Sequence, residues 1–403
     1  MNFEQFNLDS RLMNGIRNAG YEKPTPIQES AIPLALTGSD LIGTAQTGTG
    51  KTAAFVLPIL HKLLKGPRNQ TRALIITPTR ELAEQIHQTI FDLAKGTNLR
   101  SVAIYGGVGA QPQINALRRG VEIIVACPGR LLDHMQNHHA RLDAIEVLVL
   151  DEADRMLDMG FLPDIKRILK QLPKQRQTML FSATFPNEIE RLANQTLNQP
   201  QRISIGITRP AHTVSQILYP VPQHLKKSLL FRLLEETSTE SVLIFTRTKH
   251  RAQRLAKQLN QNGFTATSLH GNRSQNQRTS ALKGFKKGNF EIMVATDIAA
   301  RGLDIESISH VINFDMPDTP DAYIHRIGRT GRAKRSGDAF TLNTPDDRDL
   351  VRKIEKILGH KLSQKIMNDF DYTVAKQVPV QPHRSRIQKP GKRKKGRKTV
   401  SSR

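Results

Sequence analysis

The stretch Ala45-Gln46-Thr47-Gly48-Thr49-Gly50-Lys51-Thr52 decides the fold. It follows a short apolar run around Leu41 and leads into an apolar, helix-compatible stretch, which is the strand, loop and helix setting of a phosphate loop. Glycines let backbone N–H groups approach phosphate oxygens, and the new helix presents its positive end. Lys51 would supply a point charge to the β and γ phosphates, and Thr52 could ligate Mg²⁺. The alternative is a glycine-rich turn without a ligand, and Ala45 replaces the first Gly of the pattern.

The second motif is acidic and follows an apolar run. Val147-Leu148-Val149-Leu150 leads directly into Asp151-Glu152-Ala153-Asp154. Carboxylates therefore emerge at the carboxyl end of a predicted strand, where open α/β sheets bind ligands. Asp151 would hold Mg²⁺ through water, and Glu152 would orient or activate the attacking water. Acidic residues after a strand are also typical helix N-caps, but the upstream phosphate loop favours hydrolysis.

Short apolar β-branched runs alternate with longer helix-compatible stretches along the whole chain. This alternation predicts an α/β fold with parallel sheets flanked by helices, in two tandem domains. The predicted strands are residues 40–43, 73–77, 101–105, 122–126, 147–151 and 178–182 in the first half, and 241–245, 265–269, 291–295, 311–314 and 339–342 in the second. We predict domain one at 1–207, a linker at 208–213, domain two at 214–365, and a basic disordered tail at 366–403.

The composition excludes several classes of protein. The chain has 403 residues, a net charge of +24 and one cysteine, Cys127. One cysteine forms neither an internal disulfide nor a CxxC metal site, which indicates a reducing compartment. The first residues lack a signal-peptide layout, and no apolar run reaches the length of a membrane span. We therefore expect a cytoplasmic protein with no membrane partner.

The excess positive charge is divided between the body and the tail. Residues 376–403 carry eleven Lys or Arg and no acid, which leaves about +13 on the rest. The tail has too little apolar surface to fold and indicates a polyanionic partner, nucleic acid above all. A solubilising tail is the alternative. A membrane surface is disfavoured because the tail lacks apolar anchors.

Together these motifs resemble the DEAD-box ATP-dependent RNA helicases of superfamily 2, whose name is the string at 151–154. The resemblance covers roughly residues 3–345, and the short chain with its basic tail resembles the bacterial RhlE-type branch. It implies two RecA-like domains, ATP and Mg²⁺ as cofactors, and sequence-independent binding of the RNA backbone. Residues 20–28 look like the family's adenine-reading Q motif, in which Tyr21 would stack on the base and Gln28 would hydrogen-bond adenine.

The resemblance assigns a role to each motif residue. The catalytic set would be Lys51, Asp151, Glu152 and the arginine fingers Arg329 and Arg332. The ATP-binding set would be Phe3, Tyr21, Gln28, Ala45, Gln46, Thr47, Gly48, Thr49, Gly50, Lys51, Thr52 and Asp304. RNA would contact Pro78, Thr79, Arg80, Gly106, Gly107, Arg130, Arg278 and Thr296. Ser182, Thr184, His325 and Arg326 would couple nucleotide state to unwinding. The alternative for the arginines is a solvated helix face, but Gly328 and Gly331 interrupt any helical stripe.

The leading functional hypothesis is an RNA-stimulated ATPase that unwinds short duplexes or remodels RNA–protein complexes, with protein partners in ribosome assembly or RNA decay. An ATP-gated RNA clamp or annealing chaperone is the second hypothesis, and a DNA translocase is the third. Two features are not expected to supply a metal site or a nucleophile. His138 and His139 are adjacent and would diverge on a helix, which favours a polar loop. Cys127 is expected to be a buried small hydrophobe or a loop thiol.

Overall fold

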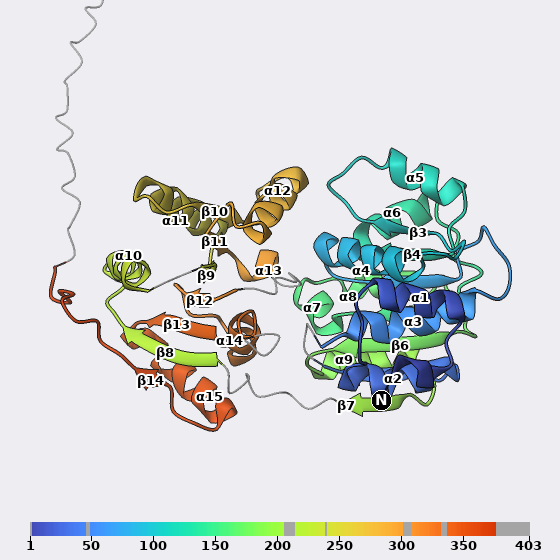
Figure 1. Cartoon of the computed structure of the whole chain (residues 1–403), viewed down its shortest axis with the longest axis horizontal. Coiled ribbons are helices and arrows are strands. Elements are labelled where there is room, and N and C mark those ends of the chain that lie inside the picture. The colour runs from blue at the N-terminus through green and yellow to red at the C-terminus, as the bar shows by residue number, and fades with distance from the viewer. Residues whose placement is uncertain are drawn as a thin grey trace, which may run out of the picture.

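The computed structural model describes residues 2–45, 49–204, 214–237, 240–300, 308–331 and 337–375, without the side chains of residues 298, 300 and 321. Two lobes lie side by side, and each is built on one seven-stranded sheet (Figure 1). Every strand pairing between the described strands is parallel. The predicted α/β class with two helix-flanked parallel sheets is therefore confirmed.

The first lobe holds the N-terminal half of the chain. Its strands run in the order β3-β4-β2-β5-β6-β1-β7. They are β1 Leu41–Thr44, β2 Ala73–Ile76, β3 Ser101–Ile104, β4 Ile123–Ala126, β5 Val147–Leu150, β6 Gln177–Ser182 and β7 Gln201–Ser204. Its helices are η1 Phe3–Phe6, α1 Ser10–Asn18, α2 Pro26–Leu36, α3 Lys51–Leu63, α4 Arg80–Leu93, α5 Gln111–Arg118, α6 Pro128–Gln136, α7 Ala153–Asp158, α8 Leu162–Leu169 and α9 Asn187–Thr196.

The second lobe repeats this topology. Its strand order is β10-β11-β9-β12-β13-β8-β14, which equals the first order when each sheet is numbered from its own first strand. The strands are β8 Val214–Pro220, β9 Val242–Phe245, β10 Ala266–Leu269, β11 Ile292–Ala295, β12 His310–Asn313, β13 Gly337–Asn343 and β14 Ser363–Gln364. The helices are α10 Lys226–Glu236, α11 Lys249–Gln261, α12 Gln275–Lys286, α13 Asp297–Ala300, α14 Pro320–Ile327, η2 Pro345–Asp347 and α15 Arg348–Leu358.

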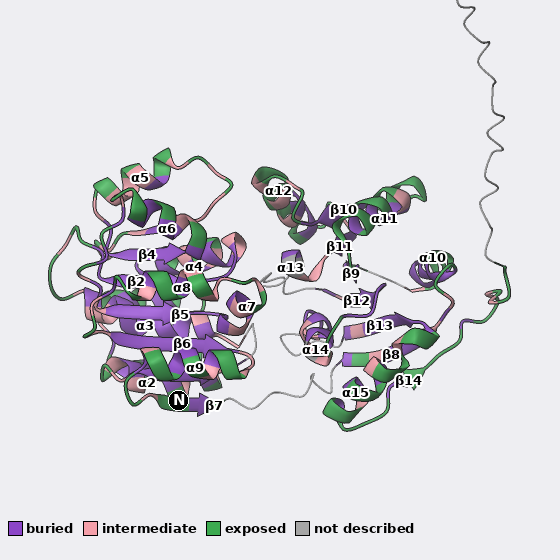
Figure 2. Cartoon of the chain, turned by 180° about the vertical axis from the view of Figure 1, so that it is seen from behind, coloured by how far each residue is buried: buried purple, intermediate pink, exposed green. Residues whose placement is uncertain are grey.

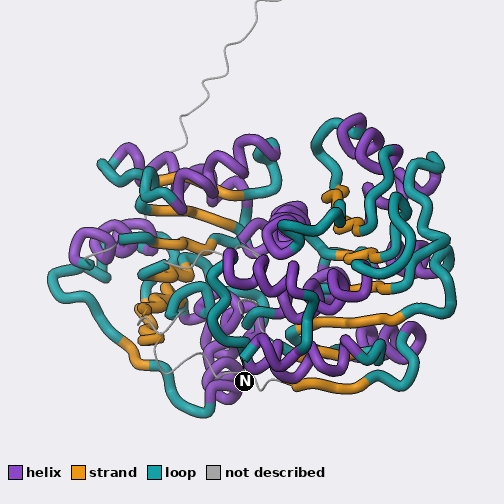
Figure 3. The backbone as a smooth tube through the Cα atoms, turned by 45° about the vertical axis from the view of Figure 1, so that its right-hand side comes forward, coloured by secondary structure: helices purple, strands orange, loops and turns teal. Residues whose placement is uncertain are grey.

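The central strands are apolar because helices cover both of their faces. Strands β2 (Ala-Leu-Ile-Ile) and β5 (Val-Leu-Val-Leu) are buried along their whole length, and so is β9 (Val-Leu-Ile-Phe). This continuous pattern is typical of parallel sheets with two covered faces. Figure 2 shows the buried strands inside partly exposed helices, and Figure 3 shows the same layering along the backbone. The loops that follow the carboxyl ends of the strands can therefore form ligand-binding sites.

All predicted strands are present, with ends within two residues of the prediction. Strands β7, β8 and β14 were missed. Strand β7 is a polar edge strand in which only Ile203 is buried, and both residues of β14 are exposed, so neither has an apolar pattern. Strand β8 mixes buried and exposed residues and ends in proline, which hides it next to the predicted linker.

The start of the predicted tail needs correction. Residues 366–375 are described, and Met367, Phe370 and Tyr372 pack against the core of the second lobe. These apolar side chains anchor a segment that its polar neighbours concealed. The linker at 208–213 and residues 376–403 lie outside the described residues. Within the described ranges, no helix is long and apolar enough to cross a membrane.

Candidate active site

The phosphate loop joins β1 to α3 as predicted. Helix α3 begins at Lys51, whose Nζ donates a hydrogen bond to the carbonyl oxygen of Ala45 at 2.5 Å and whose side chain is 6% exposed. Thr52 is the second residue of the helix, and Thr49 lies just before its N-cap. Gln46, Thr47 and Gly48 lie outside the described residues. The cation and the helix N-terminus therefore face the same loop.

The Q-motif glutamine is tied to the phosphate loop. The side-chain oxygen of Gln28 accepts the backbone N–H of Thr25 at 3.0 Å, and its amide donates to the carbonyl of Gly50 at 3.0 Å. Gly50 has a φ of 90°, and a Cβ there would lie 2.5 Å from the Gln28 amide nitrogen. A carboxamide has a second N–H and a second lone pair, so these bonds leave a donor and an acceptor for a base.

Two aromatic rings lie next to this element. The ring of Phe3 is buried and stacks on Tyr21, with centroids 6.2 Å apart and planes 25° apart. Tyr21 is 36% exposed, so its ring has a surface available for a base. Phe3 therefore positions Tyr21, whereas the prediction grouped both with the ATP contacts.

The acidic motif begins where β5 ends. Asp151 is buried, and its Oδ1 accepts the backbone N–H of Glu152 at 3.0 Å. Burial raises the pKa of the Asp151 carboxyl to about 7, although the charge of Lys51 partly opposes this rise. A carboxylate so costly to ionise without a cation suits a metal ligand. None of the described His, Cys, Asp and Glu side chains form a cluster of three or more that could hold a metal, so ligand phosphates and water would have to complete such a site.

Glu152 adopts the left-handed conformation, with a φ of 53°, and stands at the N-cap of α7. Its side chain makes no capping hydrogen bond and instead accepts from Arg155 at 2.7 Å. Glu152 therefore does not cap the helix through its side chain. Burial alone would raise the pKa of Glu152, but the charges of Arg155 and Lys51 outweigh it and lower the pKa below its usual value. Glu152 is thus held ionised as a hydrogen-bond acceptor.

The fourth residue of the motif contacts the next strand. Asp154 Oδ2 accepts the backbone N–H and the hydroxyl of Thr184 at 2.9 and 3.0 Å. Ser182 Oγ accepts the N–H of Asp154 at 3.1 Å and donates to the carbonyl of Thr184 at 2.7 Å. The predicted coupling segment after β6 is therefore bonded directly to the acidic motif.

The second lobe completes this site. A cavity of about 40 Å³ gathers Lys51, Glu152 and Arg155 from the first lobe and His325 and Arg329 from the second. Arg329 is only 5% exposed, and its charge contributes to the low pKa of Glu152. A solvated helix face is thus excluded for this arginine. Asp304 and Arg332 lie outside the described residues.

Arg326 has a different environment from its neighbours. Its side chain is 2% exposed and binds both oxygens of Asp297 at 2.6 Å. It also donates to the side chain of Asn313 at 3.1 Å and to the carbonyl of Asp315 at 2.7 Å, and it lies over the ring of Phe245. Every arm of the guanidinium is therefore used within the second lobe, which makes Arg326 a positioning residue.

The predicted RNA residues of domain one lie around the amino end of α4. Pro78 is buried, and Thr79 caps the helix by accepting the N–H of Leu82 at 3.4 Å. Gly106 and Gly107 lie against arginines: a Cβ at Gly107 would overlap the Arg80 guanidinium, and one at Gly106 would reach those of Arg80 and Arg130. The chain thus brings two arginines and a glycine turn together.

Arg130 also donates to the carbonyl of Val108 at 3.3 Å, which holds its guanidinium beside this turn. In the second lobe, Thr296 follows β11, and its N–H donates to the carbonyl of Leu269 at 3.3 Å. Arg278, expected to face RNA, forms an ion pair with Glu81 of α4 at 2.9 Å. This contact joins the two lobes.

Sequence reasoning missed three charged partners: Glu81, Arg155 and Asp297. Only Arg155 had a local signal, because it follows Glu152 by three residues on a helix. His138 and Cys127 lie in the surroundings expected for a polar loop and a buried thiol. His138 lies in an exposed turn, and Cys127 is buried, which raises the pKa of its thiol to about 12.

Two RecA-like domains whose facing sides share one cavity define a two-domain ATPase. Residues 25–192 match the family model for the DEAD/DEAH box helicase, and residues 225–334 match that for the helicase conserved C-terminal domain. The ATP-dependent RNA helicase CshA of Listeria monocytogenes is 43% identical over 94% of this chain and 73% of its own length. The chain therefore belongs to the DEAD-box ATP-dependent RNA helicases, which hydrolyse ATP. The RhlE-type resemblance stays a prediction.

Solved structures of relatives differ in how well they match. The structure of S. cerevisiae Dbp5 bound to RNA and ADP BeF3 has a TM-score of 0.81 at 30% identity, covering 91% of this chain and 96% of that one. A DEAD box protein from Methanococcus jannaschii has a TM-score of 0.53 at 38% identity, covering 91% and 99%. At equal coverage of this chain, the more identical relative fits less well, so sequence identity does not determine the fit of the whole two-domain arrangement.

Proposed function

We propose that this protein hydrolyses Mg²⁺-bound ATP in an RNA-stimulated manner and unwinds short RNA duplexes or remodels RNA–protein complexes. The observation that carries the proposal is the shared cavity with Lys51 and Glu152 on one side and Arg329 on the other. Because neither domain holds all these groups, the site is complete only when the domains are together.

Each residue of the first domain has a distinct task. Tyr21 and Gln28 would select the adenine base, and Lys51 would neutralise charge on the β and γ phosphates. Asp151, through water, and Thr52 would hold Mg²⁺, which would supply further charge neutralisation when bound. Glu152 would orient the attacking water, because its low pKa suits an acceptor better than a strong base.

Arg329 of the second domain would stabilise the charge of the transferring phosphoryl group, and Arg332 is proposed to act beside it. RNA would bind across both domains through the arginine and glycine turn around Arg80 and Arg130 and through Thr296. ATP and RNA would then both favour the closed arrangement, and by linkage each would strengthen binding of the other. We infer that closure bends one strand, which a regular duplex resists, so base pairs separate locally.

The test is Glu152→Gln in the full chain. We expect RNA-stimulated turnover to fall about 10²- to 10⁴-fold, whereas binding of ATP and RNA persists. Glu188→Gln is the matched control, because Glu188 is an exposed carboxylate on α9. Retained RNA binding also shows that the variant is folded. Substantial remaining turnover in a folded Glu152→Gln protein would remove Glu152 from the mechanism.

An ATP-gated RNA clamp shares all of these binding residues. Duplex separation with ATP and with a non-hydrolysable analogue distinguishes the two, because equal multiple-round strand release favours the clamp. The buried ionised Glu152 beside Arg329 favours turnover. We further propose that the protein acts in the cytoplasm, in ribosome assembly or RNA decay, and that its domains divide at 1–207 and from 214 onward.

A further inference from the structure

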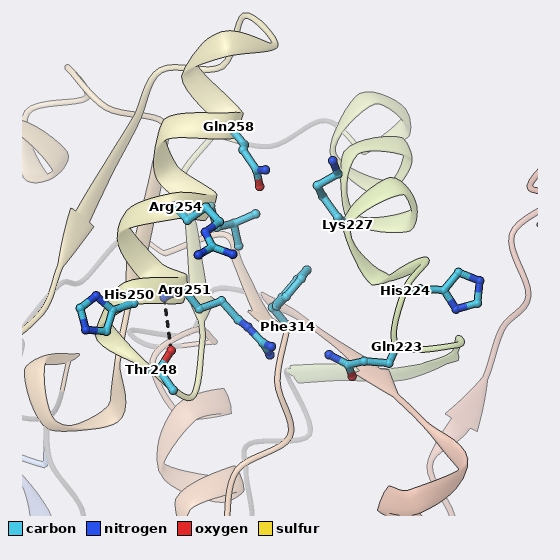
Figure 4. Close-up of a pocket in the computed structure, with 10 residues that line it drawn as sticks. Gln223, His224, Lys227, Thr248, His250, Arg251, Arg254, Gln258 and Phe314 are labelled. Carbon is cyan, nitrogen blue, oxygen red and sulfur yellow. Dashed lines mark hydrogen bonds between the residues drawn. The ribbon is translucent and has the colours of Figure 1, made fainter. Parts of the chain in front are cut away.

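A larger pocket lies on the second domain, away from the shared cavity (Figure 4). Its volume is about 380 Å³, and its walls are the segment before α10, the first turn of α10 and the first three turns of α11. Lys227, Arg251 and Arg254 point into or along it, Phe314 forms its inner wall, and His224 lines it with its ring turned away. No acidic side chain of the described residues is part of the lining, so the pocket suits an anion.

Two of its cations have no partner on the described residues. Arg251 forms an ion pair with the buried Asp315, whereas Lys227 and Arg254 make no hydrogen bond or ion pair within the described part of the chain. The first turns of α10 and α11 contain no acidic residue. Lys227 lies in the first turn of α10, where the helix dipole disfavours a positive charge. Because the side chains of Lys227 and Arg254 gain no ion pair within the described residues, we expect them to serve a ligand.

The topology places this pocket at a ligand-binding edge. The strands that lead into it are β8, β9 and β12, which correspond in sheet order to β1, β2 and β5 of the first domain. In the first domain, the ends of these strands carry the phosphate loop, the RNA-facing turn and the acidic motif. The pocket therefore occupies the second domain's own version of the edge that binds ligands.

A free nucleotide is not the favoured ligand. The segment between β8 and α10 is Val221-Pro222-Gln223-His224-Leu225, which has no glycine and loses one backbone N–H to proline. The Lys226 amino group, at the position of Lys51, is buried and donates to the carbonyl of Phe314 at 3.2 Å. The positive charges therefore come from separate side chains along a groove, without a cradle of backbone N–H groups. This arrangement suits the successive phosphates of a strand.

Two hydrogen bonds join residues at the pocket to neighbouring segments of the second domain. Lys249 at the start of α11 donates to Asn272 at 2.9 Å, which joins the pocket wall to the loop before α12. On the other side, the ring of His224 hydrogen-bonds the carbonyl of Val374 at 2.7 Å, at the end of the described chain. The sequence that follows, 376–403, carries eleven Lys or Arg and no acid.

We propose that this pocket binds the phosphates of an RNA strand where the strand continues past the cleft along the second domain. RNA as the ligand rests on the proposed function, but the pocket is separate from the cleft contacts. Lys227 and Arg254 provide the charge, and the contact would lengthen the RNA site without taking part in hydrolysis.

The experiment compares RNA of two lengths in the full chain with Lys227→Gln/Arg254→Gln. A strand of about 6 nucleotides would occupy the cleft alone, and one of about 20 would reach the pocket. Because the variant can no longer neutralise two phosphates of the single strand, the slope of log affinity against log salt should become shallower by about 1.4. Over the decade from 1 M to 0.1 M salt, this difference in slope corresponds to a roughly 25-fold lower affinity of the variant for the long strand. Short-strand affinity and ATPase stimulation should not change. Lys353→Gln/Lys356→Gln on α15 is the control, because it removes the same charge from exposed positions of the same domain.

An equal decrease of long-strand affinity in the test and control variants would overturn the proposal, since it would reflect net charge alone. Unchanged long-strand binding would also overturn it. If a second equivalent of AMP binds the wild-type chain but not the variant while RNA binding is unchanged, the pocket takes a free nucleotide and the strand proposal is wrong. Failure of the proposed function is distinguishable, because even the wild-type chain would then show no stimulation by the short strand.

Discussion

The ion pair between Glu81 and Arg278 should act as a latch between the domains. It joins α4 of the first domain to α12 of the second at 2.9 Å, and Gln275 adds a contact to the same carboxylate at 3.4 Å. The side chains are 12% and 14% exposed, so solvent screens them weakly. The variants that test the latch are Glu81→Gln, Arg278→Gln and the double variant.

The size of the effect follows from the geometry. Two unit charges at 2.9 Å attract by about 6 kcal/mol at an effective dielectric constant of 20. Desolvation of both partners removes most of this, and coupling energies for close interfacial pairs begin near about 1.5 kcal/mol. We expect about 2 kcal/mol, which corresponds to about 30-fold in the equilibrium between closed and open arrangements.

The assay is RNA affinity measured with and without a bound ATP analogue, because only the former depends on closure. Each single variant should weaken ATP-dependent RNA binding about 30-fold, and the double variant should be no worse than either. Glu84→Gln is the control, because Glu84 lies on the same helix but contacts Tyr105 of its own domain. Additive effects in the double variant would refute the latch. So would an Arg278→Gln effect of equal size without the ATP analogue, which would place Arg278 on RNA.

Three further predictions concern single residues. Arg326→Ala should lower the free energy of unfolding by about 3–5 kcal/mol, because it leaves the Asp297 carboxylate without its buried partner; chemical denaturation measures this, and a change below about 1 kcal/mol would contradict it. Cys127 should resist alkylation in the native protein up to about pH 9, since burial keeps its thiol protonated well above the usual pKa near 8.5; rapid labelling that rises through pH 8.5 would contradict the burial. Asp154→Asn should weaken the hydrogen bond to Thr184 by about 1.5–3 kcal/mol, and the rate of duplex separation should therefore fall more than the ATPase rate. Equal reductions of the two rates would mean that the hydrogen bond contributes to stability alone.

The sequence predicted the sheets because their central strands are buried on both faces. Strands such as β5 are continuously apolar, and this pattern can be recognised in the sequence without knowledge of the tertiary structure. The edge strand β7 and the two-residue β14 have mostly exposed polar residues, so only their backbone pairing identifies them. The hydrophobic pattern of a sequence cannot reveal strand pairing that depends on main-chain hydrogen bonds alone.

The site was predicted unevenly for a related reason. Motifs pointed to residues that are proposed to meet ligands, such as Lys51 and Glu152, because ligand chemistry restricts both residue type and spacing. Partners that act through another side chain had no such signal. Asp297 is adjacent to the predicted Thr296, yet its bidentate contact comes from Arg326, 29 residues later in the chain. Arg278 was assigned to RNA from its motif, and only the structure brings it to Glu81.

In each domain a charged side chain links two of the predicted motifs. In the first, Asp154 follows Glu152 by two residues and binds Thr184 of the predicted coupling segment. In the second, Arg326 lies on the same helix as His325 and binds Asp297, next to Thr296, which is a predicted RNA contact. Because these links are partly buried and charge-assisted, each domain should move as a rigid unit. The difference between nucleotide states must then be expressed between the domains, through Arg329 at the shared cavity and the Glu81 contact, which is where variants should alter coupling without unfolding either domain.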